Sequence, residues 1–185
     1  VTVDGVIHRI PKPFTVIATQ NPAGSAGTQL LPESQVDRFL IRLSMGYPAF
    51  QDEVAILKSR QGQSPLDSVQ RAASAADLRE MQSQAEQVYV ADEIYQYMAL
   101  LAGATRQNPM IRTGVSPRGT LALARMSRAA AWMEGRDYVV PEDVQSVFFD
   151  VLEHRIVPGF QAKLNQMGTR ELLEQVLNSV PAPRL

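Results

Sequence analysis

Cysteine is absent from this chain of 185 residues, which excludes disulfides, thiolate zinc sites and a cysteine nucleophile. The two histidines lie far apart in the sequence and do not suggest a metal pair, so we assign no metal ligand. No apolar run approaches the roughly 18 residues of a membrane span. Neither sign of charge dominates, with 18 Lys and Arg against 19 Asp and Glu, which argues against binding nucleic acid through bulk attraction to phosphates. We expect a protein of the reducing cytoplasm with no nucleic-acid partner and no membrane span.

The first 47 residues carry the signals of a small α/β unit. Asp4-Gly5 lies between two short apolar runs and is the dipeptide that best tolerates the positive φ angles of a tight hairpin turn. Residues 14–18 form a continuous run rich in β-branched side chains, which suits a strand buried in a parallel sheet. Apolar and polar residues alternate over residues 39–45, which predicts a second strand. A helical turn is expected between them, beginning at Pro32.

Residues 48–185 show helical patterns. Ser74 with Asp77 forms a predicted capping box, and Ser116 with Pro117 predicts another helix start. Helices are expected at about residues 52–60, 91–106, 117–135, 141–157 and 169–180, with a further helix that begins after the Ser74 cap, and a linker at 62–65. The predicted fold class is therefore a remnant of an α/β core, residues 1–47, followed by a helical bundle, residues 48–185.

Asn21 follows the first expected parallel strand, at the edge of the sheet where ligands commonly bind. A neutral amide at this place can hold a water or a phosphate oxygen without the desolvation cost of a charge. The alternative is a structural Asx turn before Pro22.

Two arginines are further candidates. The forked guanidinium of Arg38 matches two phosphate oxygens, whereas the alternative is an exposed pair with Asp37 worth under about 1 kcal/mol. Arg118 falls in the first turn of an expected helix, where the helix dipole disfavours a cation by roughly 0.3–1 kcal/mol. A bound anion would make the position of this cation favourable. The alternative is a surface arginine that turns away toward water.

The nucleotide-binding loop G-x-x-x-x-G-K-[ST] does not occur in the sequence. Asp92 and Glu93 end an apolar run, as in a magnesium-holding motif, but acidic residues also suit the first turn of a helix. We interpret them as residues of a helix start. The chain begins at Val1 rather than at a methionine, so we expect it to begin inside a larger protein.

Six motifs occur in a fixed order: V-T-V-D-G at 1–5, F-T-V-I-A-T-Q-N-P at 14–22, L-P-E-S-Q-V-D-R-F-L at 31–40, L-S-M-G-Y-P at 43–48, S-P-R-G at 116–119 and G-R-D-Y-V-V-P-E-D-V at 135–144. In this order, which covers nearly the whole chain, they resemble the MoxR family of AAA+ ATPases. The resemblance implies that Asn21 is sensor 1, which helps to place the attacking water. It implies that Arg38 is the arginine finger, which reaches the nucleotide of the neighbouring subunit, and that Arg118 is sensor 2 of the lid domain. All three would serve both catalysis and nucleotide binding.

The resemblance also implies ATP and Mg²⁺ as cofactors of the intact protein, a homo-oligomeric ring, expected to be a hexamer, and a von Willebrand factor A domain protein as partner. Such proteins are chaperone-like ATPases that mature or remodel protein complexes. The phosphate-binding loop and the magnesium-holding acids would precede Val1. We therefore expect this chain alone to hold no cofactor and to hydrolyse no ATP. We also expect the strands at 14–18 and 39–45, with unpaired edges, to pair abnormally, to pack on a neighbour or to be poorly ordered.

Two positions depart from the family pattern. The loop at residues 23–28 reads A-G-S-A-G-T where acidic residues are common, and Val140 replaces the usual capping Thr, at a cost of about 1 kcal/mol. Two other interpretations stay open. One is a stand-alone helical interaction module with no nucleotide role, and the other is a magnesium-chelatase-like AAA+ subunit, which shares the S-P-R motif.

Overall fold

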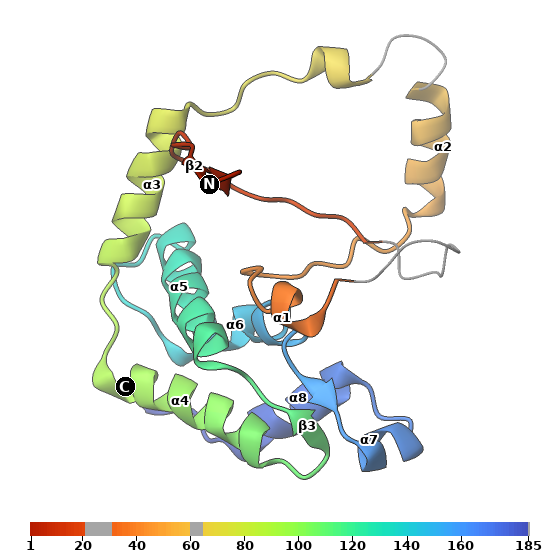
Figure 1. The fold of residues 1–185 in the computed structure, drawn as a ribbon, viewed down its shortest axis with the longest axis vertical. Coiled ribbons are helices and arrows are strands. Elements are labelled where there is room, and N and C mark those ends of the chain that lie inside the picture. The colour runs from red at the N-terminus through yellow and green to blue at the C-terminus, as the bar shows by residue number, and fades with distance from the viewer. Residues whose placement is uncertain (21–30, 60–64, 185) are drawn as a thin grey trace. The chain divides into compact units, whose positions relative to one another are not determined.

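The structure is a computed structural model that describes residues 1–20, 31–59 and 65–184. Figure 1 follows the chain from its N-terminus in red to its C-terminus in blue. The chain divides into two compact units, one of residues 1–14 and 43–80 and the other of residues 15–42 and 81–185. Both candidate arginines belong to the second unit, although 80 residues separate them in the sequence.

The first unit begins with a hairpin of two strands, β1 (Thr2–Val3) and β2 (Val6–Ile7). The strands are antiparallel, with Thr2 opposite Ile7 and Val3 opposite Val6. Both turn residues have positive φ angles, 50° at Asp4 and 79° at Gly5. Glycine adopts such angles freely because it has no Cβ, and aspartate tolerates them better than most residues. The predicted hairpin is confirmed.

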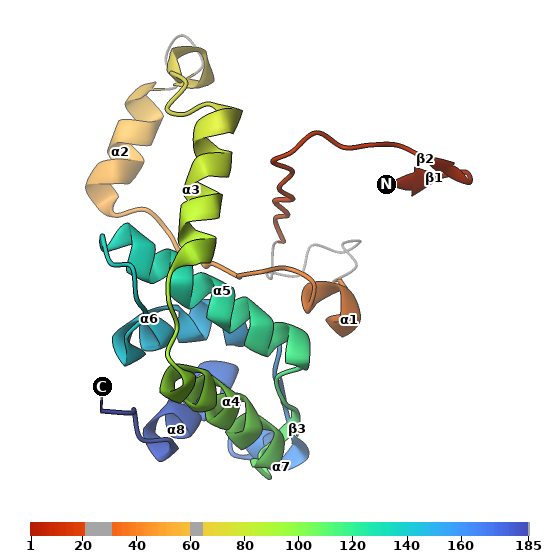
Figure 2. The same cartoon turned by 90° about the vertical axis from the view of Figure 1, so that its left-hand side faces the viewer.

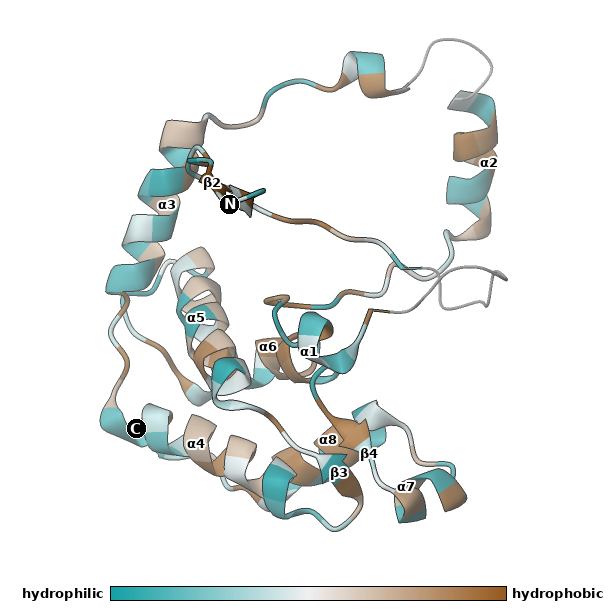
Figure 3. Cartoon of the chain, viewed as in Figure 1, coloured by the Kyte–Doolittle hydropathy of each residue, from teal (hydrophilic) through white to brown (hydrophobic). Residues whose placement is uncertain are grey.

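Helical elements follow in the first unit: α2 (Phe50–Ser59), the short 3₁₀ helix η1 (Pro65–Ser68) and the start of α3 (Ala75–Gln87), which ends in the second unit. The capping box of α3 is confirmed. The N–H of Ser74 donates to Asp77 Oδ2 at 2.7 Å, and the N–H of Asp77 donates to Ser74 Oγ at 3.1 Å. Apolar residues, brown in Figure 3, recur along α2, although none of its described residues is buried.

Four long helices build the core of the second unit: α4 (Asp92–Gln107), α5 (Pro117–Met133), α6 (Pro141–Leu152) and α8 (Thr169–Ser179). Figures 1 and 2 show α4 beside α8 and α5 beside α6, in agreement with their contacts. Apolar residues three and four positions apart face the centre of this bundle. The largest fully buried side chains include Tyr97, Met98, Leu123, Phe148 and Leu172. Among the described helices, none has both the length and the apolarity to cross a lipid bilayer.

Smaller elements connect these helices: β3 (Ile111–Thr113), β4 (Val157–Pro158) and α7 (Phe160–Leu164). The short helix α1 (Glu33–Val36) precedes them in the chain and belongs to the same unit. The sequence predicted one helix over residues 141–157, but α6 ends at Leu152. The chain beyond it pairs antiparallel with β3, and the N–H of Gly159 donates to the carbonyl of Met110 at 2.7 Å. This pairing is a contact between distant segments, so it competes with helix continuation in a way that local periodicity does not reveal.

The two segments predicted to be parallel strands, residues 14–18 and 39–45, belong to no strand in the described part of the chain. That detail of the prediction is wrong for this structure. A strand persists only where neighbouring strands take up its backbone N–H and C=O groups, and neither segment has a strand neighbour among the described residues. Ile17 and Met45 are accordingly 88% and 97% exposed. The broader prediction is confirmed, because the structure is mostly helical with two small sheets.

Candidate functional site

Arg38 lies just after α1, in the turn that follows the helix. Its backbone N–H donates to the carbonyl of Gln35 at 3.1 Å, while its side chain is exposed. Within the described residues the guanidinium of Arg38 has no hydrogen bond or ion pair. The neighbouring Asp37 does not pair with it, because that carboxylate binds other residues. The exposed Asp37–Arg38 pair considered from the sequence is therefore not formed, and among the described residues nothing offsets the charge of Arg38.

Arg118 lies in the first turn of α5. The helix begins as predicted, since Ser116 Oγ accepts a hydrogen bond from the N–H of Gly119 at 3.2 Å and Pro117 occupies the first helical position. The side chain of Arg118 is exposed and has no polar partner in the described part of the chain. No acidic residue lies in the first turn of α5 to offset this cation. The N-terminus of α5 therefore combines the positive end of a helix dipole with a free guanidinium.

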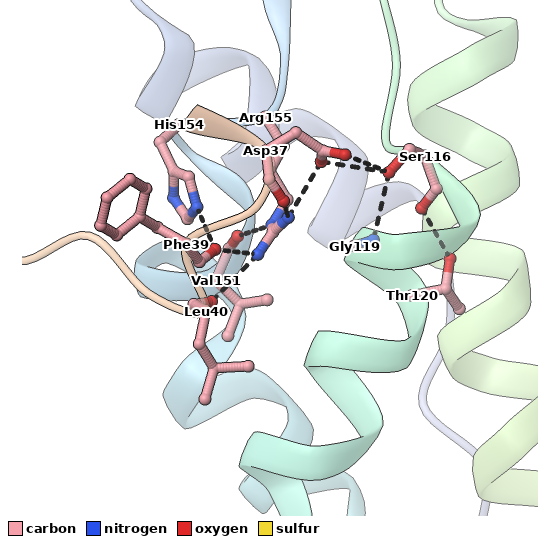
Figure 4. A network of polar contacts seen from close by, with 9 residues as sticks. All are labelled: Asp37, Phe39, Leu40, Ser116, Gly119, Thr120, Val151, His154 and Arg155. Atoms are coloured by element: carbon pink, nitrogen blue, oxygen red, sulfur yellow. Dashed lines mark hydrogen bonds and ion pairs between the residues drawn. The ribbon is translucent and has the colours of Figure 1, made fainter. Parts of the chain in front are cut away.

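The two arginine-bearing segments are joined by a hydrogen bond between their neighbouring residues. Ser116 Oγ lies 3.1 Å and 3.0 Å from the two carboxylate oxygens of Asp37. Asp37 directly precedes Arg38, and Ser116 is two residues before Arg118. Figure 4 shows that the carboxylate of Asp37 points toward the start of α5. The fold thus connects the segment that carries one candidate arginine to the helix start that carries the other.

Arg155, which follows α6, holds the same segment from a second side. Its side chain is only 1% exposed. Nη1 donates to the carboxylate and the carbonyl of Asp37, Nη2 donates to the carbonyls of Phe39 and Leu40, and Nε donates to the carbonyl of Val151 at 2.7 Å. These five bonds match the five N–H groups of a guanidinium. A charge buried this deeply is tolerated because each of its donors has an acceptor.

His154 adds one more contact to the segment. Its Nε2 lies 3.2 Å from the carbonyl of Phe39, whereas its buried Nδ1 has no partner within the described residues. Burial lowers the pKa of His154, the hydrogen bond with Phe39 opposes that shift, and the nearby charge of Arg155 lowers the pKa further. We infer that the ring is neutral at pH 7 with the proton on Nε2, since only a protonated Nε2 can donate to a carbonyl.

Gly119 allows α5 to approach Arg155. A Cβ at this position would lie 2.7 Å from Val115 Cγ1 and 2.9 Å from Arg155 Cδ, closer than real side chains come. The guanidinium of Arg155 is held by its five hydrogen bonds, so the side chain has little freedom to move away. Packing therefore explains the glycine of the S-P-R-G motif, because only a residue without a Cβ lets the first turn of α5 lie against the buried Arg155.

The chain before α5 is fixed by α4. The N–H of Val115 donates to Thr105 Oγ1 at 3.0 Å, and Arg106 Nε donates to the carbonyl of Val115 at 2.7 Å. Both backbone groups of Val115 are thus satisfied by side chains of one helix. These bonds set the point at which the chain enters α5, and with it the place of Arg118.

Asn21 lies outside the described residues, as does the loop at residues 23–28, so their expected roles stay predictions. In the part of the chain that the structure describes, no group of three or more His, Asp and Glu residues could hold a metal ion. Asp92 and Glu93 lie exposed in the first turn of α4, as expected for residues of a helix start.

Sequence reasoning did not single out Asp37 as a connecting residue, took His154 for a surface or packing residue and missed Arg155. Arg155 follows Glu153 and His154 just after a helix, where a cation suits the negative end of the helix dipole. That signal is common to many surface arginines. Only the tertiary contact with residues 37–40, more than 110 positions away, distinguishes Arg155 from them.

Comparison with protein families gives two matches. The AAA lid domain family matches residues 103–176, and the ATPase family associated with various cellular activities (AAA) matches residues 1–41. The first match contains α5 with Arg118, and the second contains Arg38 and the whole segment of residues 37–40 that Arg155 holds. Residues 103–176 include most of the helical bundle described above.

Individual proteins are similar over the whole chain. A protein named Chaperone MoxR1 from Mycobacterium tuberculosis is 34% identical over 194 residues, which cover 100% of this chain and 51% of the relative. The uncharacterized protein YeaC from Bacillus subtilis is 36% identical over 99% of this chain and 57% of its own length. A crystal structure described as that of an ATPase from Cytophaga hutchinsonii superposes with a TM-score of 0.88 at 30% identity, covering 100% of this chain and 58% of that one. The chain spans about half the length of the curated relatives it matches over its full extent.

Proposed function

Because the chain belongs to the MoxR family of AAA+ ATPases, we propose that it is the C-terminal part of a chaperone-like ATPase that couples ATP hydrolysis to the maturation or remodelling of protein complexes. In this proposal residues 1–47 complete an α/β core and residues 48–185 form the lid. The intact protein forms a homo-oligomeric ring, a hexamer, in the cytoplasm and acts with a von Willebrand factor A domain protein. The name of the MoxR1 relative supports the chaperone class, and the AAA family match supports ATP hydrolysis.

The observation that carries the proposal is the exposure of Arg38 and Arg118 on two segments that the fold joins. Arg38 and Arg118 are exposed and lack polar partners among the described residues, yet their segments are joined through Asp37 and Ser116. A cation in the first turn of a helix is unfavourable by roughly 0.3–1 kcal/mol until an anion binds there. Phosphate oxygens fit this arrangement, because guanidinium forks bind them through paired hydrogen bonds.

Each residue has a separate role in the proposal. Arg118 binds the terminal phosphate of the nucleotide in its own subunit, whereas Arg38 reaches the nucleotide of the neighbouring subunit and offsets charge in the transition state. Asn21 orients the attacking water. Catalysis of phosphoryl transfer depends on such positioning and added positive charge more than on covalent chemistry. Mg²⁺ supplies charge neutralisation when bound, and the described residues offer no carboxylate cluster for it. The chain alone is proposed to be inactive because its sequence has no phosphate-binding loop.

Rings assembled from two variants test whether Arg38 and Arg118 act on nucleotides of different subunits. The experiment uses the protein extended to the full length of its relatives, as the Arg38→Ala and Arg118→Ala variants, alone and mixed. In a head-to-tail ring, an interface between the two variants can combine an intact Arg118 from one subunit with an intact Arg38 from its neighbour. We expect each variant alone to lose turnover, by about 10³–10⁵-fold in the case of Arg38→Ala. The mixture of the two variants should regain part of the lost turnover.

The readout is phosphate release at saturating Mg·ATP. Arg42→Ala, on the same segment as Arg38, serves as the control and should keep normal turnover. Full activity of the Arg38→Ala ring would contradict the finger assignment. Loss of activity in both variants without any recovery on mixing would place both arginines at the same subunit's nucleotide instead.

A further inference from the structure

The hydrogen bonds of the deeply buried Arg155 are concentrated on one short segment of the chain, which a general stabilising role does not require. One of its five acceptors, the carbonyl of Val151, belongs to α6. The other four belong to residues 37–40, which form neither a helix nor a strand. Three backbone carbonyls and one carboxylate of a short irregular segment thus converge on one guanidinium (Figure 4).

The bound groups flank Arg38 on both sides. Arg155 holds the carbonyl of Asp37 before it and the carbonyl of Phe39 after it. With its two neighbours anchored, the backbone of Arg38 is fixed while its side chain stays free. This is the arrangement expected for a catalytic side chain that must reach out from a rigid support, because small misplacements of a reacting group are costly.

The same guanidinium is also linked to the helix start that carries Arg118. Asp37, which accepts from Arg155 at 2.9 Å, accepts from Ser116 Oγ as well. The side chain of Arg155 lies directly against the first turn of α5 at Gly119. One residue therefore contacts both segments that bear the candidate arginines.

We propose that Arg155 is a positioning residue for nucleotide hydrolysis: through Asp37 and the carbonyls of residues 37–40 it sets the place of Arg38 relative to the first turn of α5. The proposal rests on the proposed function, in which Arg38 acts on a nucleotide. Arg155 itself has no free donor left for a phosphate, so it acts on a nucleotide only indirectly, and the proposal assigns this indirect effect to Arg38.

The test compares two substitutions of the same kind in the protein extended to the full length of its relatives. Arg155→Lys keeps the charge but replaces the five-donor fork with a point charge that cannot reach all five acceptors. Arg42→Lys is the matched control. Arg42 also ties this segment to the end of α6, through Glu153 at 3.2 Å, but as an exposed ion pair with a side chain 56% accessible. Asp37→Asn serves as a second variant should Arg155→Lys not fold.

We expect Arg155→Lys to lower kcat by about tenfold to a hundredfold, with KM for ATP changed less than about twofold, and Arg42→Lys to leave both unchanged. Circular dichroism at the assay temperature checks that each variant is folded. In an Arg38→Ala background, measured by phosphate release over long incubations, Arg155→Lys should cause no further loss. A merely structural Arg155 would lower stability without this dependence on Arg38.

The outcomes separate the two proposals. If Arg38→Ala leaves turnover intact, the finger assignment fails and this inference fails with it. If Arg38→Ala abolishes turnover but neither Arg155→Lys nor Asp37→Asn lowers kcat, only the positioning role is overturned. An equal loss from Arg155→Lys with and without Arg38 would also overturn it, because the residue would then act independently of Arg38.

Discussion

Asp143 accepts two hydrogen bonds from the guanidinium of Arg136, at 2.5 Å and 2.6 Å, and a third from the N–H of Val140 at 2.8 Å. The hydrogen bond to Asp143 raises the pKa of Arg136, so the guanidinium stays charged. Val140 occupies the position before α6 where a side-chain cap is usual, and it has no side-chain oxygen. Asp143, held by Arg136, therefore supplies one half of a capping box. The other half, a side-chain acceptor at position 140, is missing, and the N–H of Asp143 donates to the carbonyl of Val140 at 3.0 Å.

Restoring the missing cap should stabilise the chain. We expect Val140→Thr, nearly isosteric, to raise the free energy of unfolding by about 1 kcal/mol, because the new hydroxyl accepts from the N–H of Asp143. The urea midpoint measures the change. Val139→Thr is the control. Since Val139 is buried, the same substitution there adds a hydroxyl to an apolar site and should lower the midpoint. A lowered midpoint for Val140→Thr would contradict this account of the helix start.

Gly119→Ala should destabilise the second unit by about 1–3 kcal/mol, because its methyl group would overlap Val115 and Arg155. Gly103→Ala is the matched control, since Gly103 lies within α4 and its Cβ would meet nothing within 4 Å. That substitution should be neutral or stabilising by up to about 1 kcal/mol, because alanine favours helices. Thermal unfolding of both variants tests the pair. Equal stability of the two would show that α5 does not pack on Arg155 as described.

The lowered pKa of His154 predicts a pH dependence of stability. The unfolded chain takes up a proton at His154 near its ordinary pKa of 6.5, whereas the folded chain does so only at lower pH. His154 therefore makes its full contribution to the free energy of unfolding above about pH 6.5. That contribution is lost as the pH falls from there through the lowered pKa of the folded chain. The neighbouring charged groups are Arg155, Arg42 and Asp37.

His154→Gln keeps an N–H for the carbonyl of Phe39 but does not titrate. We expect the difference in unfolding free energy between the original chain and this variant to shift in favour of the original as pH rises through that window. Urea unfolding at several pH values between 5 and 8 measures the difference. A difference that is flat across this range would mean that His154 titrates alike in the folded and unfolded chain.

The 185-residue chain by itself should show no binding of Mg·ATP in a calorimetric titration. Arg38 and Arg118 offer two cations, but the sequence has no phosphate-binding loop. Sodium sulfate at the same ionic strength is the control for weak, nonspecific attraction of anions. Micromolar affinity for Mg·ATP would contradict the proposal that most phosphate ligands lie outside this chain.

Local signals in the sequence predicted the helices well. Ser74 with Asp77 and Ser116 with Pro117 begin helices as expected, because a cap is a contact between residues three apart in the chain. The strands expected at residues 14–18 and 39–45 failed for the opposite reason, since a strand depends on a neighbour that its own residues do not contain. The end of α6 was misplaced because β4 pairs with a segment more than 40 residues earlier.

The candidate site divides in the same way. Arg38 and Arg118 stand out in the sequence because their chemistry and their motifs are local properties, and the family follows from the order of those motifs. The junction of Asp37, Ser116 and Arg155 was decided by tertiary structure alone, because a buried guanidinium needs acceptors that only a folded chain can gather around it. Composition, caps and motifs thus determined the helices and the family, whereas long-range packing decided which residues support the two arginines.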